Sequence, residues 1–201
     1  MKIISVWNPK GGQAKSLISI NLAAAACELG LKPLVVCEDP QGTSTKYHNA
    51  GNLPFEVIPG IPKDKPDADI VIIDHPASDW DLPPANTVIM PTKADRPDIS
   101  TYQDALAVIK PSGKRVIPVV TDGNMQRQAQ VRAVKGMRQA GAFELKSSGV
   151  YSRAGEEYRT IFDPEMNTAY KVNDRRAEFE AILSAVLNMQ AQDDDSMRKV
   201  A

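Results

Sequence analysis

The loop at residues 8–16, NPKGGQAKS, constrains the fold of this chain more than any other feature. It follows an apolar segment at residues 2–7, which predicts a short strand. It precedes residues 16–29, rich in Ala, Leu and Ile, which predict a helix. A strand, a glycine-rich loop and a helix in this order are typical of a phosphate-binding loop, whose backbone N–H groups surround an anion at the helix N-terminus. In such a loop Lys15 would contact the β- and γ-phosphates of a nucleotide, and the Ser16 hydroxyl would ligate Mg²⁺.

Strand and helix patterns alternate along the rest of the chain. Further strands are expected at residues 34–38, 70–74, 87–90 and 115–121, and helices at 99–109, 125–139 and 174–189. This alternation predicts an α/β fold with a mostly parallel twisted sheet flanked by helices, the fold of P-loop NTPases. Residues 43–69 are polar and rich in Pro and Gly, so we expect irregular structure there. We expect one domain over residues 1–190 and a flexible polar tail over 191–201.

The composition excludes several classes of protein. With 201 residues and 42% hydrophobic residues, the chain has the length and character of an ordinary globular domain. No apolar run approaches the roughly 18 residues of a membrane-spanning helix. The two cysteines, Cys27 and Cys37, lack a C-x-x-C spacing and there are only two histidines, which argues against a structural zinc site or a disulfide framework. A cytoplasmic location is therefore expected.

The net charge of −1 conceals an uneven distribution. Residues 110–176 hold 13 Lys and Arg against 7 Asp and Glu, a net charge of +6. Such a segment is compatible with a surface that binds phosphates, although solvated helix faces would give the same composition. The candidates for DNA contacts are Lys110, Lys114, Arg115, Arg127, Arg132, Lys135, Arg138, Arg153, Arg159, Lys171, Arg175 and Arg176.

Four segments together resemble one known family. The pattern K-G-G-x-x-K-S at residues 10–16 resembles the deviant Walker A motif of the ParA/MinD family of ATPases. Residues 35–42, VVCEDPQG, resemble the second strand of that family, residues 70–74 its Walker B strand and residues 87–92 the strand that follows. A weaker similarity runs through residues 152–163. The resemblance covers roughly residues 1–190 and is strongest to the short plasmid-partition ParA type.

The resemblance implies that the chain binds ATP and Mg²⁺ and forms a homodimer with two nucleotides between the subunits. Lys10 matches the signature lysine that reaches the partner's nucleotide, Asp39 the aspartate that positions water, and Asp74 the Walker B aspartate. The expected catalytic residues are Lys10, Lys15 and Asp39, and the expected metal site contains Ser16, Asp39 and Asp74. The expected nucleotide-binding residues are Lys10, Gly11, Gly12, Gln13, Ala14, Lys15, Ser16 and Leu17.

Three positions depart from the family pattern. Ala14 replaces the usual Gly before the lysine, and it would be strained if its φ were positive. Cys37 replaces an acidic residue close to Mg²⁺, and Glu38 points to the other side of the strand. His75 replaces a Thr, and we expect it to be a packing or hydrogen-bonding residue rather than a catalytic base or a metal ligand.

The resemblance favours a partition or positioning ATPase that binds non-specific double-stranded DNA in its ATP state and is nucleoid-associated. An adaptor or centromere-binding protein would stimulate its slow hydrolysis. A helix-turn-helix before Lys10 is not expected. A membrane-cycling relative is disfavoured because the end of the chain is acidic and nearly without an apolar face. An iron-protein reductase is disfavoured by the places of the cysteines, and a small-molecule ligase remains a minor alternative. The main alternative is a nucleotide-binding scaffold with little or no hydrolysis.

Overall fold

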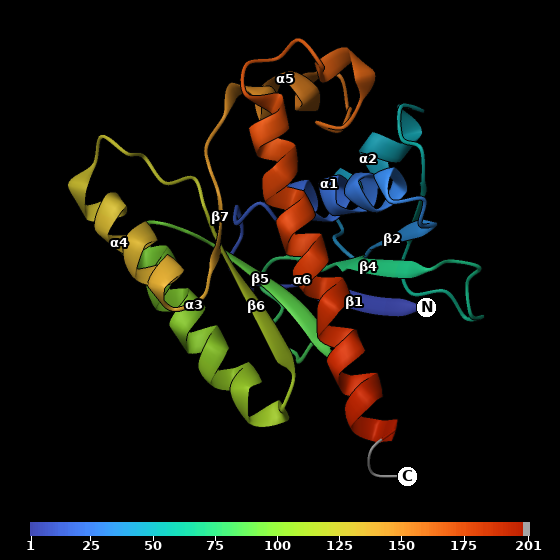
Figure 1. Cartoon of the computed structure of the whole chain (residues 1–201), viewed down its shortest axis with the longest axis horizontal. Helices are drawn as coiled ribbons and strands as arrows, with labels where there is room; N and C mark the ends of the chain where they lie inside the picture. The colour runs from blue at the N-terminus through green and yellow to red at the C-terminus, as the bar shows by residue number, and fades with distance from the viewer. Residues whose placement is uncertain (199–201) are drawn as a thin grey trace.

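The sheet of the computed structural model, which describes residues 1–198, contains seven parallel strands in the order β3-β2-β4-β1-β5-β6-β7 (Figure 1). This confirms the expected α/β fold with a parallel sheet flanked by helices. Each connection between parallel strands must return from the carboxyl end of one strand to the amino end of the next. The loops that follow the strands therefore all lie at the carboxyl edge of the sheet. The strands are β1 (Lys2–Val6), β2 (Pro33–Cys37), β3 (Glu56–Pro59), β4 (Ile70–Asp74), β5 (Thr87–Lys93), β6 (Arg115–Thr121) and β7 (Phe143–Leu145).

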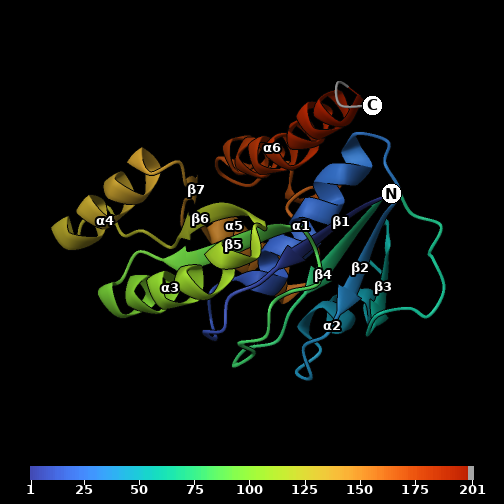
Figure 2. The ribbon, with the colours of Figure 1, turned by 90° about the horizontal axis from the view of Figure 1, so that it is seen from below.

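Helices cover both faces of the sheet. In Figure 2, α1 (Lys15–Glu28) and α6 (Val172–Arg198) lie on one side of the sheet and α3 (Arg96–Ile109) lies on the other. The side chains along a strand alternate between these two faces. In β6, Ile117 and Val119 face the core that includes α1 and α6, whereas Val116 and Val120 face α3 and α4. The other helices are α2 (Thr43–Asn49), α4 (Gln128–Gln139), α5 (Gly149–Glu156) and the short 3₁₀ helices Lys110–Ser112 and Pro164–Met166.

The expectation of irregular structure over residues 43–69 is wrong. This stretch contains the helix α2 and the edge strand β3. Neither has a clear hydrophobic period, and both depend on long-range packing. Tyr47 of α2 packs edge-on against the Tyr158 ring with centroids 5.4 Å apart. Val57 of β3 is buried in the main core.

Two elements extend beyond their expected ends. β5 continues to Lys93 through Pro91, because the ladder between β1 and β5 ends at Ile89 and the missing N–H of Pro91 breaks no hydrogen bond there. Its carbonyl instead accepts a hydrogen bond from Asn8 Nδ2 at 2.7 Å.

α6 runs to Arg198, so residues 190–198 are helical where a frayed polar end was expected, and residues 199–201 lie outside the described residues. The division into a domain over 1–190 and a tail over 191–201 stays a prediction.

Candidate nucleotide-binding site

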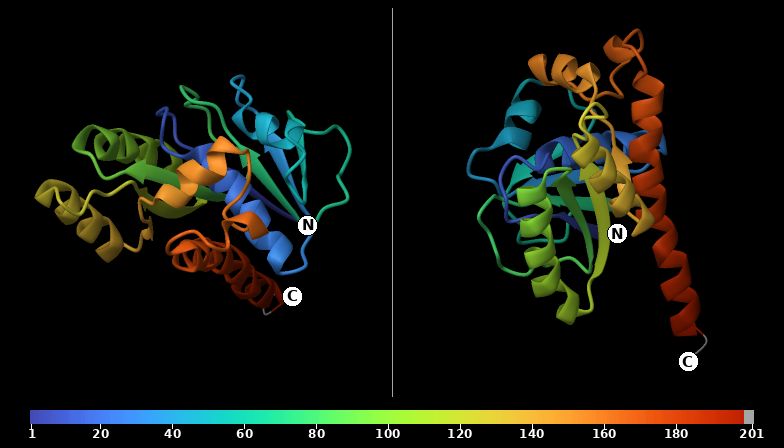
Figure 3. Two further views of the ribbon diagram at one scale, coloured as in Figure 1. Left: turned by 90° about the horizontal axis from the view of Figure 1, so that it is seen from above. Right: turned by 90° about the vertical axis from the view of Figure 1, so that its left-hand side faces the viewer.

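Three loops meet at the carboxyl edge of the sheet. They follow β1, β2 and β4, and Figures 2 and 3 show them projecting from the same side of the molecule. Val6 and Cys37 are both register partners of Asp74, so the three strands end level with one another. The order of the strands changes direction at β1, and this is the point in an open α/β sheet at which ligands bind.

The loop after β1 has the backbone of an anion cradle. Gly12 has φ +72° and Ala14 has φ 63° and ψ 25°, both in the left-handed region. α1 begins at Lys15, and the Ala14 carbonyl accepts the Ile18 N–H at 3.0 Å. The condition under which Ala14 would be strained is therefore met, since an alanine occupies a conformation that favours glycine.

Lys15 lies inside this loop. It is 7% exposed, and its Nζ donates hydrogen bonds to the carbonyls of Asn8 at 2.9 Å and Lys10 at 3.2 Å. Burial lowers the pKa of Lys15, while the charges of Asp74 and Asp39 counteract part of that effect. Among the described residues, the ammonium group hydrogen-bonds only to these two carbonyls, and a phosphate would supply an anion in direct contact with it.

Asp74, at the end of β4, is fully buried. Its Oδ2 accepts a 2.6 Å hydrogen bond from Ser44 Oγ, and the Ser16 hydroxyl also lies near the carboxylate. Burial raises the pKa of Asp74; the hydroxyls of Ser44 and Ser16 and the charge of Lys15 oppose this, and the charge of Asp39 adds to it. Asp39 itself lies in the loop after β2, where its Oδ1 accepts the Gln41 N–H at 2.9 Å.

The remaining oxygen of Asp74 fits a metal site. Asp74 Oδ1 is buried and has no hydrogen-bond partner among the described residues. Across the described chain, no group of three or more His, Cys, Asp and Glu could hold a metal by itself. Mg²⁺ needs no such group, since it is typically held by one or two protein ligands together with substrate phosphates. Ser16 and Asp74 fit this pattern, with Asp39 in the same electrostatic environment.

Lys10 lies at the rim of the loop and pairs with an aspartate of α3. Its Nζ is 2.7 Å from Asp98 Oδ1, and its side chain is 34% exposed. Gln13 Nε2 also donates to Asp98 Oδ1 at 2.8 Å, and Gln13 Oε1 accepts the Lys93 N–H at 2.8 Å. This network ties the loop to β5 and α3, and the sequence did not indicate it.

A cavity of about 410 Å³ adjoins the loop. Its walls combine the loop residues with the segments after β6 and β7, which the motifs did not reveal. Asp122 follows β6 with φ 54°, a conformation enriched in aspartate. The pair Asp122–Gly123 is a local signal in the sequence that could have marked this turn. The lining residues are Gly12, Ala14, Leu17, Lys93, Thr121, Asp122, Leu145, Lys146, Ser147, Ser148, Tyr151 and Ser152.

His75 has the hydrogen-bonding role expected for it. Its Nε2 lies 3.0 Å from Ser5 Oγ, and its Nδ1 lies 3.0 Å from Glu38 Oε2 without hydrogen-bond geometry. Burial lowers the pKa of His75 to about 4; the charge of Asp79 opposes this and that of Lys15 adds to it. The ring is therefore neutral at pH 7 and the contact with Glu38 is not an ion pair.

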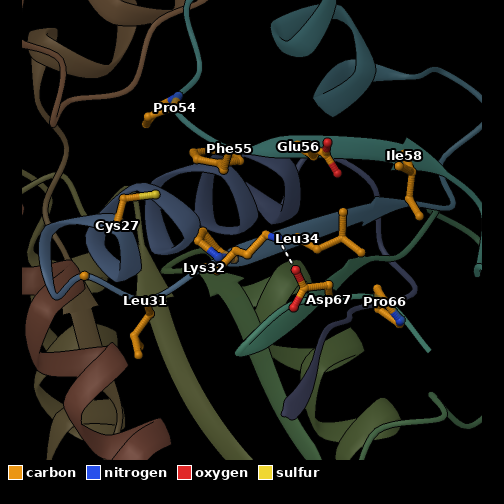
Figure 4. A pocket seen from close by; sticks show the side chains of 12 residues that line it. Cys27, Leu31, Lys32, Leu34, Pro54, Phe55, Glu56, Ile58, Pro66 and Asp67 are labelled. Carbon is orange, nitrogen blue, oxygen red and sulfur yellow. Dashed lines mark hydrogen bonds and ion pairs between the residues drawn. The ribbon is translucent and has the colours of Figure 1, made fainter.

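A second cavity, of about 540 Å³, lies at the opposite end of β2 (Figure 4). Pro33 and Leu34 at the start of β2, Phe55 beside β3 and the half-buried Cys27 line it, and the Lys32–Asp67 ion pair at 2.5 Å lies beside them. The phosphate-binding loop is at the other end of the strand, so this cavity is not part of the nucleotide site.

The candidate DNA-contacting residues differ in their surroundings. Arg175 is 6% exposed and pairs with Glu178 at 3.1 Å, so the expectation that it faces DNA is wrong. Arg159 pairs with Asp163, and Arg176 donates to the Ile161 carbonyl, which gives both of them structural contacts. The exposed candidates are Lys110, Arg127, Arg132, Lys135, Arg138, Arg153 and Lys171.

Comparisons with known proteins agree with this geometry. A family model described as an AAA domain matches residues 1–109. McdA from Cyanothece in complex with ATP is 15% identical over 94% of this chain and 96% of its own, with a TM-score of 0.69. The cell division ATPase MinD from Pyrococcus furiosus is 16% identical (94% and 99% covered, TM-score 0.68). A plasmid partition protein from Borrelia burgdorferi bound to AMPPNP is 17% identical (94% and 99% covered, TM-score 0.69). The chain therefore belongs to the AAA domain family, as an ATPase with the fold of the ParA/MinD deviant Walker A proteins.

Proposed function

We propose that this ATPase forms a homodimer with ATP, binds non-specific double-stranded DNA in that state and positions a plasmid, a chromosome or another cargo. An adaptor or centromere-binding protein would carry the cargo and stimulate a slow hydrolysis. The observation that supports this proposal is the contrast between the two lysines of one loop: Lys15 is buried within the loop, whereas Lys10 lies at its rim and is one-third exposed.

This contrast suits a site shared by two subunits. Lys15 is placed for the nucleotide of its own chain, and Mg²⁺ held near Ser16 and Asp74 would neutralise part of the phosphate charge. Two chains that each carry ATP would repel one another unless each contributed a cation to the other's nucleotide. Lys10 can do so once it leaves Asp98, because its side chain already lies at the surface.

The exposed face of α4 is the best-placed surface for DNA. Arg132, Lys135 and Arg138 recur every third residue, and Arg127 precedes the helix. Contacts of Lys and Arg with phosphates give affinity without sequence preference, and that affinity falls steeply with salt. Among the described residues, no helix combines the length and apolar character needed to cross a membrane. Nucleoid association would follow from the DNA binding.

A nucleotide-binding scaffold with little or no hydrolysis is the second candidate, and Cys37 favours it. Cys37 is 5% exposed and lies in register with Asp74, at a position where the family has a carboxylate. A thiol is a poor ligand for Mg²⁺. Turnover of ATP, measured with and without DNA and the adaptor, distinguishes the two candidates.

The test is fluorescence anisotropy of a labelled random-sequence duplex of about 30 base pairs, titrated with protein and Mg²⁺ at two salt concentrations. We expect tighter binding with ATP than with ADP, lost in Lys10→Ala and Lys15→Ala. Lys32→Ala is the control, since Lys32 also pairs with an aspartate but lies at the far end of β2. Equal binding with both nucleotides would remove DNA from the proposal. Normal binding by Lys10→Ala would overturn the role of Lys10.

Asp39 tests the release step separately. If Asp39 positions the attacking water, Asp39→Ala should still bind DNA with ATP. It should then stay bound during the time in which wild-type protein hydrolyses its ATP and dissociates. Dissociation at the wild-type rate would mean that another residue positions the water.

A further inference from the structure

We propose that Ser44 is a positioning residue for the Asp74 carboxylate: its hydroxyl holds Oδ2 so that Oδ1 stays free for hydrated Mg²⁺. This inference deepens the proposed function, since it rests on the nucleotide and metal site described above.

The contact has the geometry of a strong hydrogen bond. Ser44 Oγ and Asp74 Oδ2 are 2.6 Å apart, and both residues are fully buried. An ionised carboxylate has no hydrogen to give, so Ser44 donates. Hydroxyl-to-carboxylate bonds of this length are stronger than neutral ones, and burial removes competing water.

The other oxygen shows what the arrangement leaves open. Asp74 Oδ1 is buried and has no partner among the described residues, which is costly for a carboxylate unless a cation or water completes it. Ser44 therefore satisfies one oxygen and leaves the second for a ligand. The Ser16 hydroxyl also favours the ionised form of Asp74, but Ser16 is itself an expected ligand of Mg²⁺. Ser44 comes from a different element and keeps its contact whichever partner Ser16 has.

Cys37 makes this support more important. It pairs in register with Asp74, and its thiol contacts the Asp39 carbonyl of its own loop at 3.7 Å. It offers no carboxylate to the metal, so the orientation of one buried carboxylate decides how well Mg²⁺ is held. Groups that orient a metal ligand in this way commonly change metal affinity by about 10–100-fold when they are removed.

Ser44 also connects two loops. It is the second residue of α2, which directly follows the Asp39–Gly42 turn. The bond to Asp74 thus fixes the start of α2, and with it the loop that carries Asp39, to the end of β4. The sequence offered no sign of this, since a serine at the start of a polar segment is ordinary.

The experiment compares nucleotide binding with and without the metal. A fluorescent ATP analogue is titrated into wild type and Ser44→Ala in EDTA, and Mg²⁺ is then added stepwise. We expect unchanged affinity in EDTA and an apparent Mg²⁺ affinity about tenfold weaker in the variant. Amide hydrogen exchange over residues 43–49 should also be faster in Ser44→Ala.

Ser19→Ala is the matched control. Ser19 is equally buried, but its hydroxyl donates to the Lys15 carbonyl of its own helix at 3.0 Å. It should leave the Mg²⁺ affinity at the wild-type value. Ser44→Cys, which keeps the volume but donates only weakly, takes the place of Ser44→Ala should the alanine variant not fold.

The outcomes are distinct. A loss of affinity by the same factor in EDTA and in Mg²⁺ would show that Ser44 only supports the fold, and it would overturn the inference. Unchanged Mg²⁺ affinity in Ser44→Ala or Ser44→Cys would do the same. If wild-type protein bound no nucleotide under either condition, the nucleotide site itself would be wrong, and the inference would fall with it.

Discussion

Ala14 is the position at which a single substitution should stabilise the protein. Its φ of 63° and ψ of 25° place an L-residue in the left-handed region, at a cost of about 1–2 kcal/mol. Ala14→Gly removes that cost but gives the unfolded chain more freedom, which offsets about 0.4–1 kcal/mol. The net gain in the free energy of unfolding is about 0.5–1 kcal/mol, which raises Tm by about 1–4 °C in a chain of this size.

Thermal unfolding followed by circular dichroism, without nucleotide or Mg²⁺, measures this change. The control is Ala107→Gly, at an exposed position inside α3. A glycine there should lower the free energy of unfolding by about 1 kcal/mol, because Ala107 already has a helical backbone conformation that alanine favours over glycine. If Ala14→Gly lowered Tm as Ala107→Gly does, Ala14 would not be strained and the loop would differ from the one described.

Three other substitutions test separate parts of the site. Asp98→Asn keeps an acceptor for Gln13 but removes the charge that pairs with Lys10, so ATP-dependent dimerisation measured by sedimentation velocity should strengthen about fivefold, the equivalent of about 1 kcal/mol. The pKa of His75 is about 4 in the folded protein and 6.5 in the unfolded chain. Between pH 6.5 and pH 4 the imidazole is therefore protonated in the unfolded chain but neutral in the folded protein. Stability should therefore fall by about 3 kcal/mol as the pH drops from 6.5 to 4, and chemical denaturation of His75→Asn should show that loss removed. Asn21→Ala removes the acceptor of the buried Ile161 N–H at 2.9 Å and should cost about 1–3 kcal/mol in urea unfolding.

Each of these has a contradicting result. A dimer that is unchanged or weaker in Asp98→Asn would mean that the ion pair does not compete with dimerisation. Burial raises the pKa of Asp74 and Glu38, so these carboxyls oppose the effect of His75, but they are present in both proteins and cancel in the comparison. Identical pH profiles for wild type and His75→Asn would refute the shift. A cost below about 0.5 kcal/mol for Asn21→Ala would show that water replaces the lost acceptor.

The sequence predicts those parts of the site whose residues all lie within one short segment. The loop at residues 8–16 combines strand end, glycines, lysine and helix start within a few residues, and Asp74 closes an apolar strand. Contacts between distant segments were not predictable. The pair Lys10–Asp98 depends on how α3 packs beside the loop after β1, and the pair Ser44–Asp74 on how α2 packs beside the end of β4. None of these aspartates and serines carries a local signal for its partner.

The same distinction applies to the fold. Five strands were predicted because their apolar runs fill a sheet with helices on its faces. β3 and β7 were missed because each is an edge strand of four or three residues, with Glu56 and Glu144 interrupting the apolar pattern. Their pairing with β2 and β6 is set by the finished sheet rather than by their own composition.

The central place of β1 bears on the order in which the chain can fold during synthesis. Both of its neighbours, β4 and β5, are translated after it, and the loop that it carries gains the hydrogen bond to Pro91 and the ion pair with Asp98 only when those residues have been made. Later still, α6 covers α1, and the Lys2 side chain hydrogen-bonds to the Val186 carbonyl. Long sequence separations of this kind delay folding, since loop closure must precede the contacts that reward it. A nascent chain thus exposes the apolar strand β1 until nearly half of the residues have been added, and chaperone capture at residues 2–7 would protect it until β4 and β5 arrive.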